Sequence, residues 1–253
     1  EKALDKIIAA KTTLLVQMPF YGTLSYLLKF VENENIPTMG TDGTYLVYNP
    51  KFVLKLPDDQ LRGVICHEIL HIANGHPWRI RPHHIHIKAN FAMDYVVNPM
   101  VLESKLSLPP GCLINEDYNG LPWEEVYNLL PDIFGKGCGI GEVYQAGSLG
   151  DREEAGKGKY ITEDEWKLTM AQSARAHKAS GYGNLPGFID RMVDGLLNPK
   201  INWKEQLDYL VIKIISKDDY TWSKPNKRYL PQGLYLPSIY SEEVPLLAIT
   251  LDS

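Results

Sequence analysis

The sequence is poor in cysteine and contains no long apolar run. Cys66, Cys112 and Cys138 form no Cys-x-x-Cys pair and leave one thiol over, which indicates a reducing compartment. No apolar segment approaches the 18 or so residues of a membrane span. The N-terminus also lacks the basic-then-apolar order of a signal peptide. These absences argue against a transmembrane protein and a disulfide-rich secreted domain, and we expect a cytoplasmic protein.

An excess of positive charge and a phosphate-binding glycine motif are also missing. The 26 Lys and Arg are outnumbered by 31 Asp and Glu, which argues against nucleic acid or an anionic membrane as a partner. The Gly-rich stretch 135–159 fits neither Gly-x-Gly-x-x-Gly nor the P-loop pattern, so we expect no nucleotide loop. What is present is 253 residues with a 44% hydrophobic share, enough for a globular protein with a buried core.

The strongest motif lies in the stretch 64–76, which contains His-Glu-x-x-His. On a helix, His67 and His71 project from one face, one turn apart, so both imidazoles can bind one divalent ion. Glu68 lies on an adjoining face, where its carboxylate can hold and deprotonate a water on that ion. The surrounding positions are nearly all apolar, and a buried carboxylate between two imidazoles is costly unless it is paired or metal-bound. The alternative is a chance match or a metal-free pair in the core.

A second predicted helix, over about residues 88–102, supplies the candidate third ligand. Its apolar residues leave Asn90, Asp94 and Asn98 as one polar stripe. We predict that Asp94 is the third ligand and that the two asparagines orient its carboxylate. His76 follows His71 by five residues, about 140° around the helix, so we predict that it is not a ligand. Two alternatives remain: a solvated Asp94, or an Asp94 that bonds a ligand imidazole while water completes the coordination.

The rest of the chain is predicted from its periodicity and its turn residues. Asp42-Gly43 within 36–50 predicts a hairpin, either the edge strand that receives an extended substrate or an ordinary cover for the core. The Gly-rich stretch 135–160 is predicted to be a mobile insertion, with an active-site lid as the alternative. Further helices are predicted over 3–17, 20–32, 57–75, 119–130, 162–179, 185–197 and 203–216.

Several smaller features have two interpretations each. His83, His84 and His86 form either a solvated loop or a second cation site. Tyr95 beside Asp94 could donate to an oxyanion, but we expect it in the core because a helix neighbour points about 100° away. The apolar run 244–251 ends in Asp-Ser, which is how the metal-ion site of a von Willebrand A-like domain begins. Because the chain starts without Met and stops after this run, we expect a fragment of a longer protein.

These signals together resemble a bacterial family of metallopeptidase-like proteins with a von Willebrand A-like domain at the C-terminal end. Only His-Glu-x-x-His with Asp94-Tyr95 is specific, and the other segments matter through their order. The chain stops before the second Ser of an Asp-x-Ser-x-Ser motif could appear. In chain order the matching segments are Pro19-Phe20, 36–38, 41–43, 48–50, 64–76 with Arg79, 92–98, 123–127, 185–187, 202–203, 222–228 and 249–253.

The resemblance implies an α+β, zincin-like fold, mainly helical, with a small antiparallel sheet or hairpin and a His-Glu-x-x-His active-site helix. A metallopeptidase-like domain would cover residues 1–240, and 241–253 would be the first strand of a truncated von Willebrand A-like domain. His67, His71 and Asp94 would bind Zn²⁺, and Glu68 would be the general base. An AAA-type ATPase partner is a family-level expectation.

Two classes of function follow. In the first, the protein is a zinc-dependent peptidase that cleaves a protein or peptide with Glu68 as general base. In the second, it is a non-catalytic, metal-stabilised scaffold that acts through its von Willebrand A-like domain with an AAA-type ATPase. Glu68 favours the peptidase, because a structural zinc site has four closed ligands and needs no base.

Overall fold

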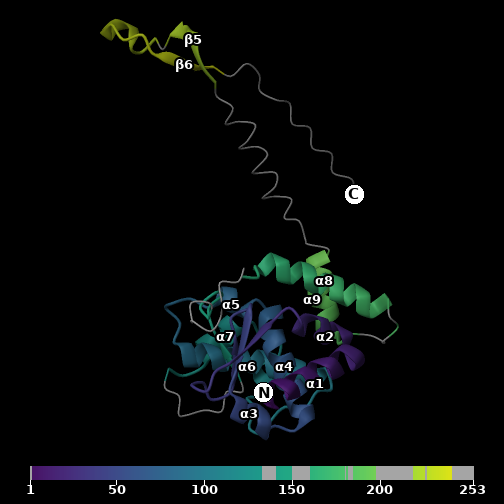
Figure 1. The fold of residues 1–253 in the computed structure, drawn as a ribbon. Helices are drawn as coiled ribbons and strands as arrows, with labels where there is room; N and C mark the ends of the chain where they lie inside the picture. Colours follow the sequence, from purple (N-terminus) through teal and green to yellow (C-terminus); the bar gives the residue numbers. More distant parts are fainter. Residues whose placement is uncertain are drawn as a thin grey trace. The chain divides into compact units, whose positions relative to one another are not determined.

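A computed structural model describes residues 2–132, 141–149, 160–179, 181, 185–197, 219–225 and 227–240. The chain divides into two units, Glu1–Asn198 and Pro199–Ser253. In the described residues, the first unit is mostly helical and holds one four-stranded sheet, an α+β arrangement (Figure 1). None of the described helices combines the length and apolarity that a membrane crossing requires.

The N-terminal part differs from the prediction in one element. Helix α1 (Lys2–Gln17) is followed by α2 (Pro19–Ser25), and the two pack closely because Gly22 has no side chain: a Cβ there would lie 2.2 Å from the Cα of Leu15. The predicted helix over 20–32 is therefore too long. Residues Lys29–Glu32 form strand β1, whose partner is β3. Leucines at helical spacing favoured a helix, but pairing with a distant strand decides the structure.

The sheet contains the predicted hairpin, flanked by two further strands. Strands β2 (Met39–Thr41) and β3 (Tyr45–Tyr48) are antiparallel, which confirms the hairpin, and the turn holds Gly43 at φ 90°. The strand order is β1-β3-β2-β4, with β1 parallel to β3 and β2 parallel to β4. The sheet is thus mixed, not antiparallel as predicted. Both hairpin strands are interior, which argues against the first of the two alternatives, the edge strand that receives a substrate.

The described part of the Gly-rich stretch is packed into the fold. Residues Gly141–Val143 form strand β4 beside β2. Leu149 is 2% exposed, and its N–H donates to Asp42 Oδ2 at 3.1 Å. The prediction of a mobile insertion is therefore wrong for residues 141–149. For 133–140 and 150–159 it falls outside the described residues.

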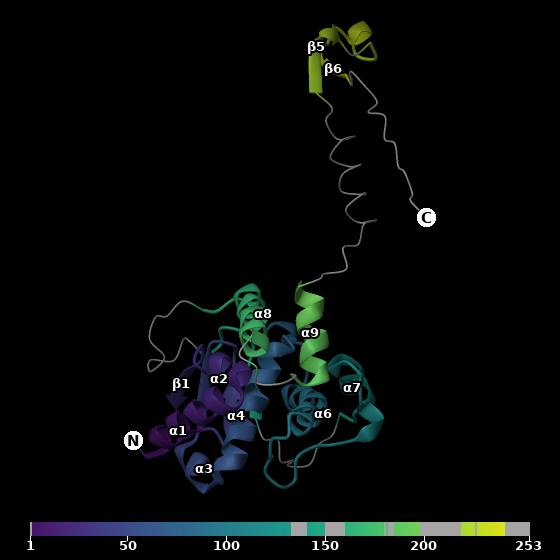
Figure 2. The ribbon, with the colours of Figure 1, turned by 90° about the vertical axis from the view of Figure 1, so that its right-hand side faces the viewer.

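Helix α4 (Asp58–Ala73) lies between the N-terminal helices and α6 (His86–Glu103), and nearly all of it is buried (Figure 2). Gly63 allows a close approach, because a Cβ there would lie 1.8 Å from the carbonyl oxygen of Ser107. The two helices predicted to carry the site are confirmed within a few residues. The other described helices of this unit are α3 (Pro50–Lys55), α5 (His76–Arg79), η1 (Glu116–Tyr118), α7 (Trp123–Leu129), α8 (Glu163–Ala179) and α9 (Gly187–Leu197).

In the second unit, strands β5 (Asp219–Pro225) and β6 (Pro237–Tyr240) form an antiparallel pair, and η2 (Leu230–Gln232) lies between them in the sequence. The helix predicted over 203–216 and the strand predicted over 244–251 lie outside the residues that the structure describes. The expected start of a von Willebrand A-like domain falls in the same undescribed region.

Candidate metal centre

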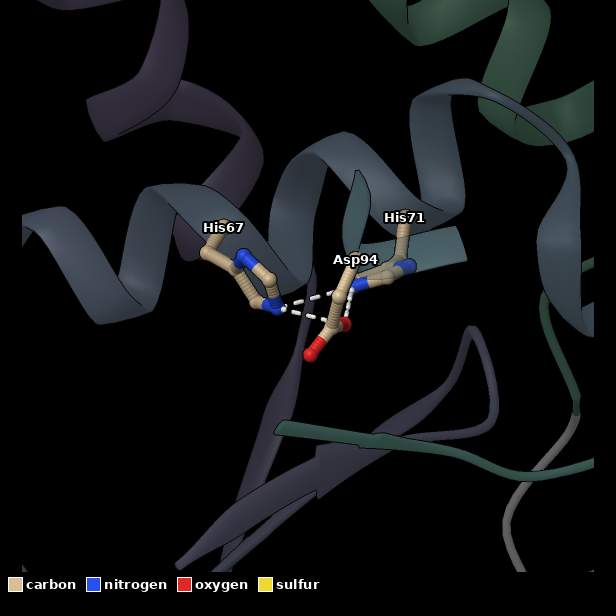
Figure 3. Close-up of side chains that lie close together, drawn as sticks. All are labelled: His67, His71 and Asp94. Atoms are coloured by element: carbon tan, nitrogen blue, oxygen red, sulfur yellow. Dashed lines mark hydrogen bonds and ion pairs between the residues drawn. The ribbon is translucent and has the colours of Figure 1, made fainter. Parts of the chain in front are cut away.

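Three buried side chains from α4 and α6 point toward one another (Figure 3). The Nε2 atoms of His67 and His71 are 2.8 Å apart. Asp94 Oδ1 lies 3.4 Å from Nε2 of His67 and 3.3 Å from Nε2 of His71. All three residues are at most 1% exposed. The returning helix α6 thus brings Asp94 to the pair of imidazoles on α4.

The chemistry of these three donors fits a divalent metal ion. Zinc bonds to nitrogen and oxygen are about 2.0–2.2 Å long and tetrahedral, which places neighbouring ligand atoms roughly 3.3 Å apart. The separations of 2.8, 3.4 and 3.3 Å are close to that value. Both oxygens of Asp94 are buried without a hydrogen bond from any described residue. Because a buried carboxylate is costly when unpaired, a cation between the three would complete the site.

Glu68 lies beside this group as the next residue after His67. Its side chain is fully buried, and both oxygens are without a hydrogen-bond partner within the described part of the chain. Burial, together with the charges of Asp94 and Glu142, raises the pKa of Glu68 to about 8, although His67 opposes the shift. Cation binding nearby favours the ionised form. The metal-free site therefore holds a carboxyl group that can gain and release a proton near neutral pH.

The three ligand candidates shift one another's pKa values. Burial lowers the pKa of His67, but its contact with Asp94 and the charge of Glu68 outweigh burial and raise it above its usual value. Burial and the neighbouring His67 lower the pKa of His71 to about 4. Burial would raise the pKa of Asp94, yet the two histidines lower it. The raised pKa of His67 and the lowered pKa of Asp94 favour the charged forms of both groups, and a metal ion bound between them would compete with the proton on His67.

Strand β4 passes directly over the site. A Cβ at Gly141 would lie 2.0 Å from Glu68 Oε1 and 3.2 Å from His67 Nε2, so only glycine fits. The sequence prediction missed this residue, because a glycine in a Gly-rich stretch indicates a loop. The sequence contained one sign of a buried strand here, the apolar Val143 two positions after Gly141. In the structure Val143 is 1% exposed.

The two asparagines on α6 have different partners from those predicted. Asn90 Oδ1 accepts the N–H of Val143 at 3.0 Å, and its Nδ2 contacts His86 Nδ1 at 3.2 Å. Asn98 Nδ2 donates to the carbonyl of Leu113 at 2.9 Å, and the same side chain helps to raise the pKa of His67. Neither asparagine donates to Asp94, so the prediction that they orient its carboxylate is wrong.

His76 lies outside the group of three. Gly75 adopts φ 72°, in the left-handed region, and turns the chain back after α4. As a result, Nδ1 of the buried His76 lies 2.8 Å from Nδ1 of His71, on the side of that ring away from Asp94. Burial lowers the pKa of His76 well below its usual value. The sequence argument placed His76 away from the ion but missed this contact.

The other candidate residues lie elsewhere. Within the described ranges, His67, His71 and Asp94 form the one group with metal-binding geometry, so the loop histidines make no second site. The rings of His83 and His84 contact each other at 4.3 Å. Tyr95 is partly buried and packs edge-on against Tyr118 at 5.1 Å, as expected for a core residue.

The chain is similar to a known protein and matches one protein family. The chain is 26% identical over 267 residues to a protein of Thermotoga maritima named "Uncharacterized protein", and the match covers 94% of this chain. The chain spans 65% of the length of that relative. No solved structure matches the chain significantly. Residues 3–240 match the family described as "Putative metallopeptidase domain". The chain with His67, His71 and Asp94 at its centre therefore belongs to this metallopeptidase family.

Proposed function

We propose that the protein is a zinc-dependent peptidase with a zincin-like active site on α4, acting on a protein or peptide. The observation that carries the proposal is the position of Glu68. A buried, unpaired carboxyl group lies directly beside a His-His-Asp group of metal-binding geometry. A structural zinc site needs a fourth protein ligand and no such base.

Each residue of the site would have a separate role. His67 and His71 would hold zinc through Nε2, and Asp94 through Oδ1. With zinc bound, the site would lower the pKa of a water and polarise the scissile carbonyl. Glu68 would take the proton from the attacking water and return it to the leaving amine. A bound cation would favour the ionised form of Glu68 that this role needs. Burial of all four side chains strengthens these electrostatic interactions.

One observation favours a second function. Strand β4 lies against Glu68, and the four site residues are at most 1% exposed, so the site is closed to a substrate as far as the described residues show. A non-catalytic scaffold, stabilised by its metal and working with an AAA-type ATPase through a von Willebrand A-like domain, would need no such path. Peptide cleavage would distinguish the peptidase from the scaffold.

The test uses the full chain loaded with zinc. Wild type, Glu68→Gln and Glu142→Gln are each incubated with a denatured proteome, and new peptide termini are identified by mass spectrometry. Removing a general base costs about 10²- to 10⁴-fold in rate, so new termini should disappear with Glu68→Gln. They should remain with Glu142→Gln, which removes a nearby acid outside the metal group. Identical termini from wild type and Glu68→Gln would reject the peptidase and favour the scaffold.

A further inference from the structure

The two ring nitrogens of His71 have different neighbours. Its Nε2 faces Nε2 of His67 at 2.8 Å and Oδ1 of Asp94 at 3.3 Å. Its Nδ1 faces Nδ1 of His76 at 2.8 Å. Two imidazole nitrogens at this distance share a single hydrogen, so one ring donates and the other accepts.

The His71 nitrogen that faces the metal site decides which of the two rings donates this hydrogen bond. Binding a cation through Nε2 requires the lone pair on that atom, so a neutral His71 carries its hydrogen on Nδ1. His71 then donates to His76 Nδ1, and His76 carries its own hydrogen on Nε2. We propose that His76 is a positioning residue that fixes the tautomer and the ring orientation of His71 for metal binding. The inference rests on the metal-binding part of the proposed function and not on peptide hydrolysis.

Contacts of the neighbouring residues hold His76 in this position. Gly75, in the left-handed conformation, separates α4 from α5 immediately before His76. Arg79, one turn later, donates to the carbonyl of Asn74 at 3.0 Å and pairs with the carboxylate of Glu124, through Nε at 2.9 Å among other contacts. The end of α4, the turn and the start of α7 are therefore tied together around the His76 backbone.

The far side of the His76 ring suits the same tautomer. The ring lies 6.3 Å from that of the buried Trp123, and both residues line a cavity of about 580 Å³. A cavity of this size has room for a water that accepts the Nε2 hydrogen. Acceptors that orient a ligand histidine in this way typically change metal affinity by about 10- to 100-fold.

The experiment measures zinc affinity of the full chain by competition with a chelator. His76→Phe keeps a ring but removes the acceptor, and it should weaken zinc binding about 10- to 100-fold. His76→Asn offers a side-chain oxygen to the same hydrogen and should bind within a few-fold of wild type. His84→Phe, a matched control whose ring also lies near Trp123, at 5.0 Å, should bind as wild type does. Nitrogen NMR of His71 should show the hydrogen on Nδ1 in wild type and His76→Asn, and a tautomer mixture in metal-free His76→Phe.

Three results would overturn the inference. Wild-type affinity in His76→Phe would show that the contact does not matter for the metal. A loss in His76→Asn equal to that in His76→Phe would show that packing matters and the acceptor does not. A loss as complete as that of Asp94→Ala would make His76 a ligand. If wild type cleaves nothing but these affinities hold, the peptidase proposal fails and the role of His76 stands.

Discussion

Glu68 is the residue whose ionisation state matters most to this protein. Its carboxyl group is fully buried, and no described residue donates a hydrogen bond to it. Burial, with Asp94 and Glu142 adding to it, raises its pKa from 4.5 to about 8 in the metal-free protein. A group whose pKa is raised by folding binds its proton more tightly in the native state. Its contribution to stability is complete below the unfolded pKa and is lost as the pH rises through the folded one.

This gives a prediction for the metal-free protein. The free energy of unfolding of wild type relative to Glu68→Gln should fall as the pH rises from about 4.5 to about 8. Glutamine cannot ionise, so the difference reports the proton of Glu68 together with its effect on the pKa of His67, which the charge of Glu68 raises. Each unit of pKa difference corresponds to about 1.4 kcal/mol. Urea unfolding at several pH values, with a chelator present, measures the difference, and parallel pH profiles of the two proteins would contradict the prediction.

Asp94 provides a second prediction at this scale. Asp94→Asn keeps the shape of the side chain but removes the charge that faces both imidazoles at 3.3–3.4 Å. We expect the folded variant to lose its zinc on dialysis against a weak chelator, whereas His76→Ala should keep a measurable fraction. Zinc content by elemental analysis and folding by circular dichroism test this. Full retention of zinc in folded Asp94→Asn would show that the carboxylate is not a ligand.

The candidate site could be predicted where its residues follow helical periodicity. His67, Glu68 and His71 are fixed by spacing on one helix, and Asp94 stood out on a polar stripe of the next. The contacts of Gly141 and Asn90 could not be predicted. They arise from a strand whose residues lie 53 to 74 positions further along the chain, and no local pattern encodes such a contact.

At the scale of elements, β4 is held on both of its edges. On one edge the N–H of Tyr144 donates to the carbonyl of Thr41, which continues the pairing with β2. On the other edge Asn90 Oδ1 accepts the N–H of Val143, and His86 Nε2 contacts its carbonyl at 3.1 Å. Two side chains of α6 thus take the place of a neighbouring strand.

Gly141→Ala tests how closely β4 is fitted to the metal helix. Because the new Cβ would lie 2.0 Å from Glu68 Oε1, the strand must move. Overpacking of this kind typically costs about 1–3 kcal/mol. We expect lower stability and faster amide exchange in residues 141–149, measured by hydrogen exchange with mass spectrometry. Gly195→Ala is the control, because a Cβ there meets nothing within 4 Å and helix propensity favours alanine.

If Gly141→Ala exchanged as slowly as wild type in residues 141–149, β4 would not lie against Glu68 as described.

The elements that the sequence did not predict share a physical cause. Strands β1 and β4 are short, three or four residues, and each pairs in parallel with a strand that is not its neighbour in sequence. Their hydrogen bonds depend on tertiary structure, whereas helices α4 and α6 are apparent from their own sequence.

For the whole molecule, metal binding should appear as thermal stability of one unit. All three ligand candidates lie in Glu1–Asn198. A ligand at 100 times its Kd stabilises the native state by about 2.7 kcal/mol. Removing zinc should therefore lower the Tm of this unit in calorimetry of the full chain. Asp94→Asn should melt at one temperature with or without zinc, and a Tm of wild type that is independent of zinc would contradict the prediction.

If the protein is the peptidase proposed above, the close approach of Gly141 to Glu68 would also affect the kinetics of cleavage. Among the described residues β4 covers the carboxyl group, so a peptide would reach it after β4 has separated from β2 and α6, an event that is first-order in the protein. The maximal turnover rate would then equal the rate at which β4 opens, and it would not depend on which peptide is cleaved. Different peptides would share one maximal rate.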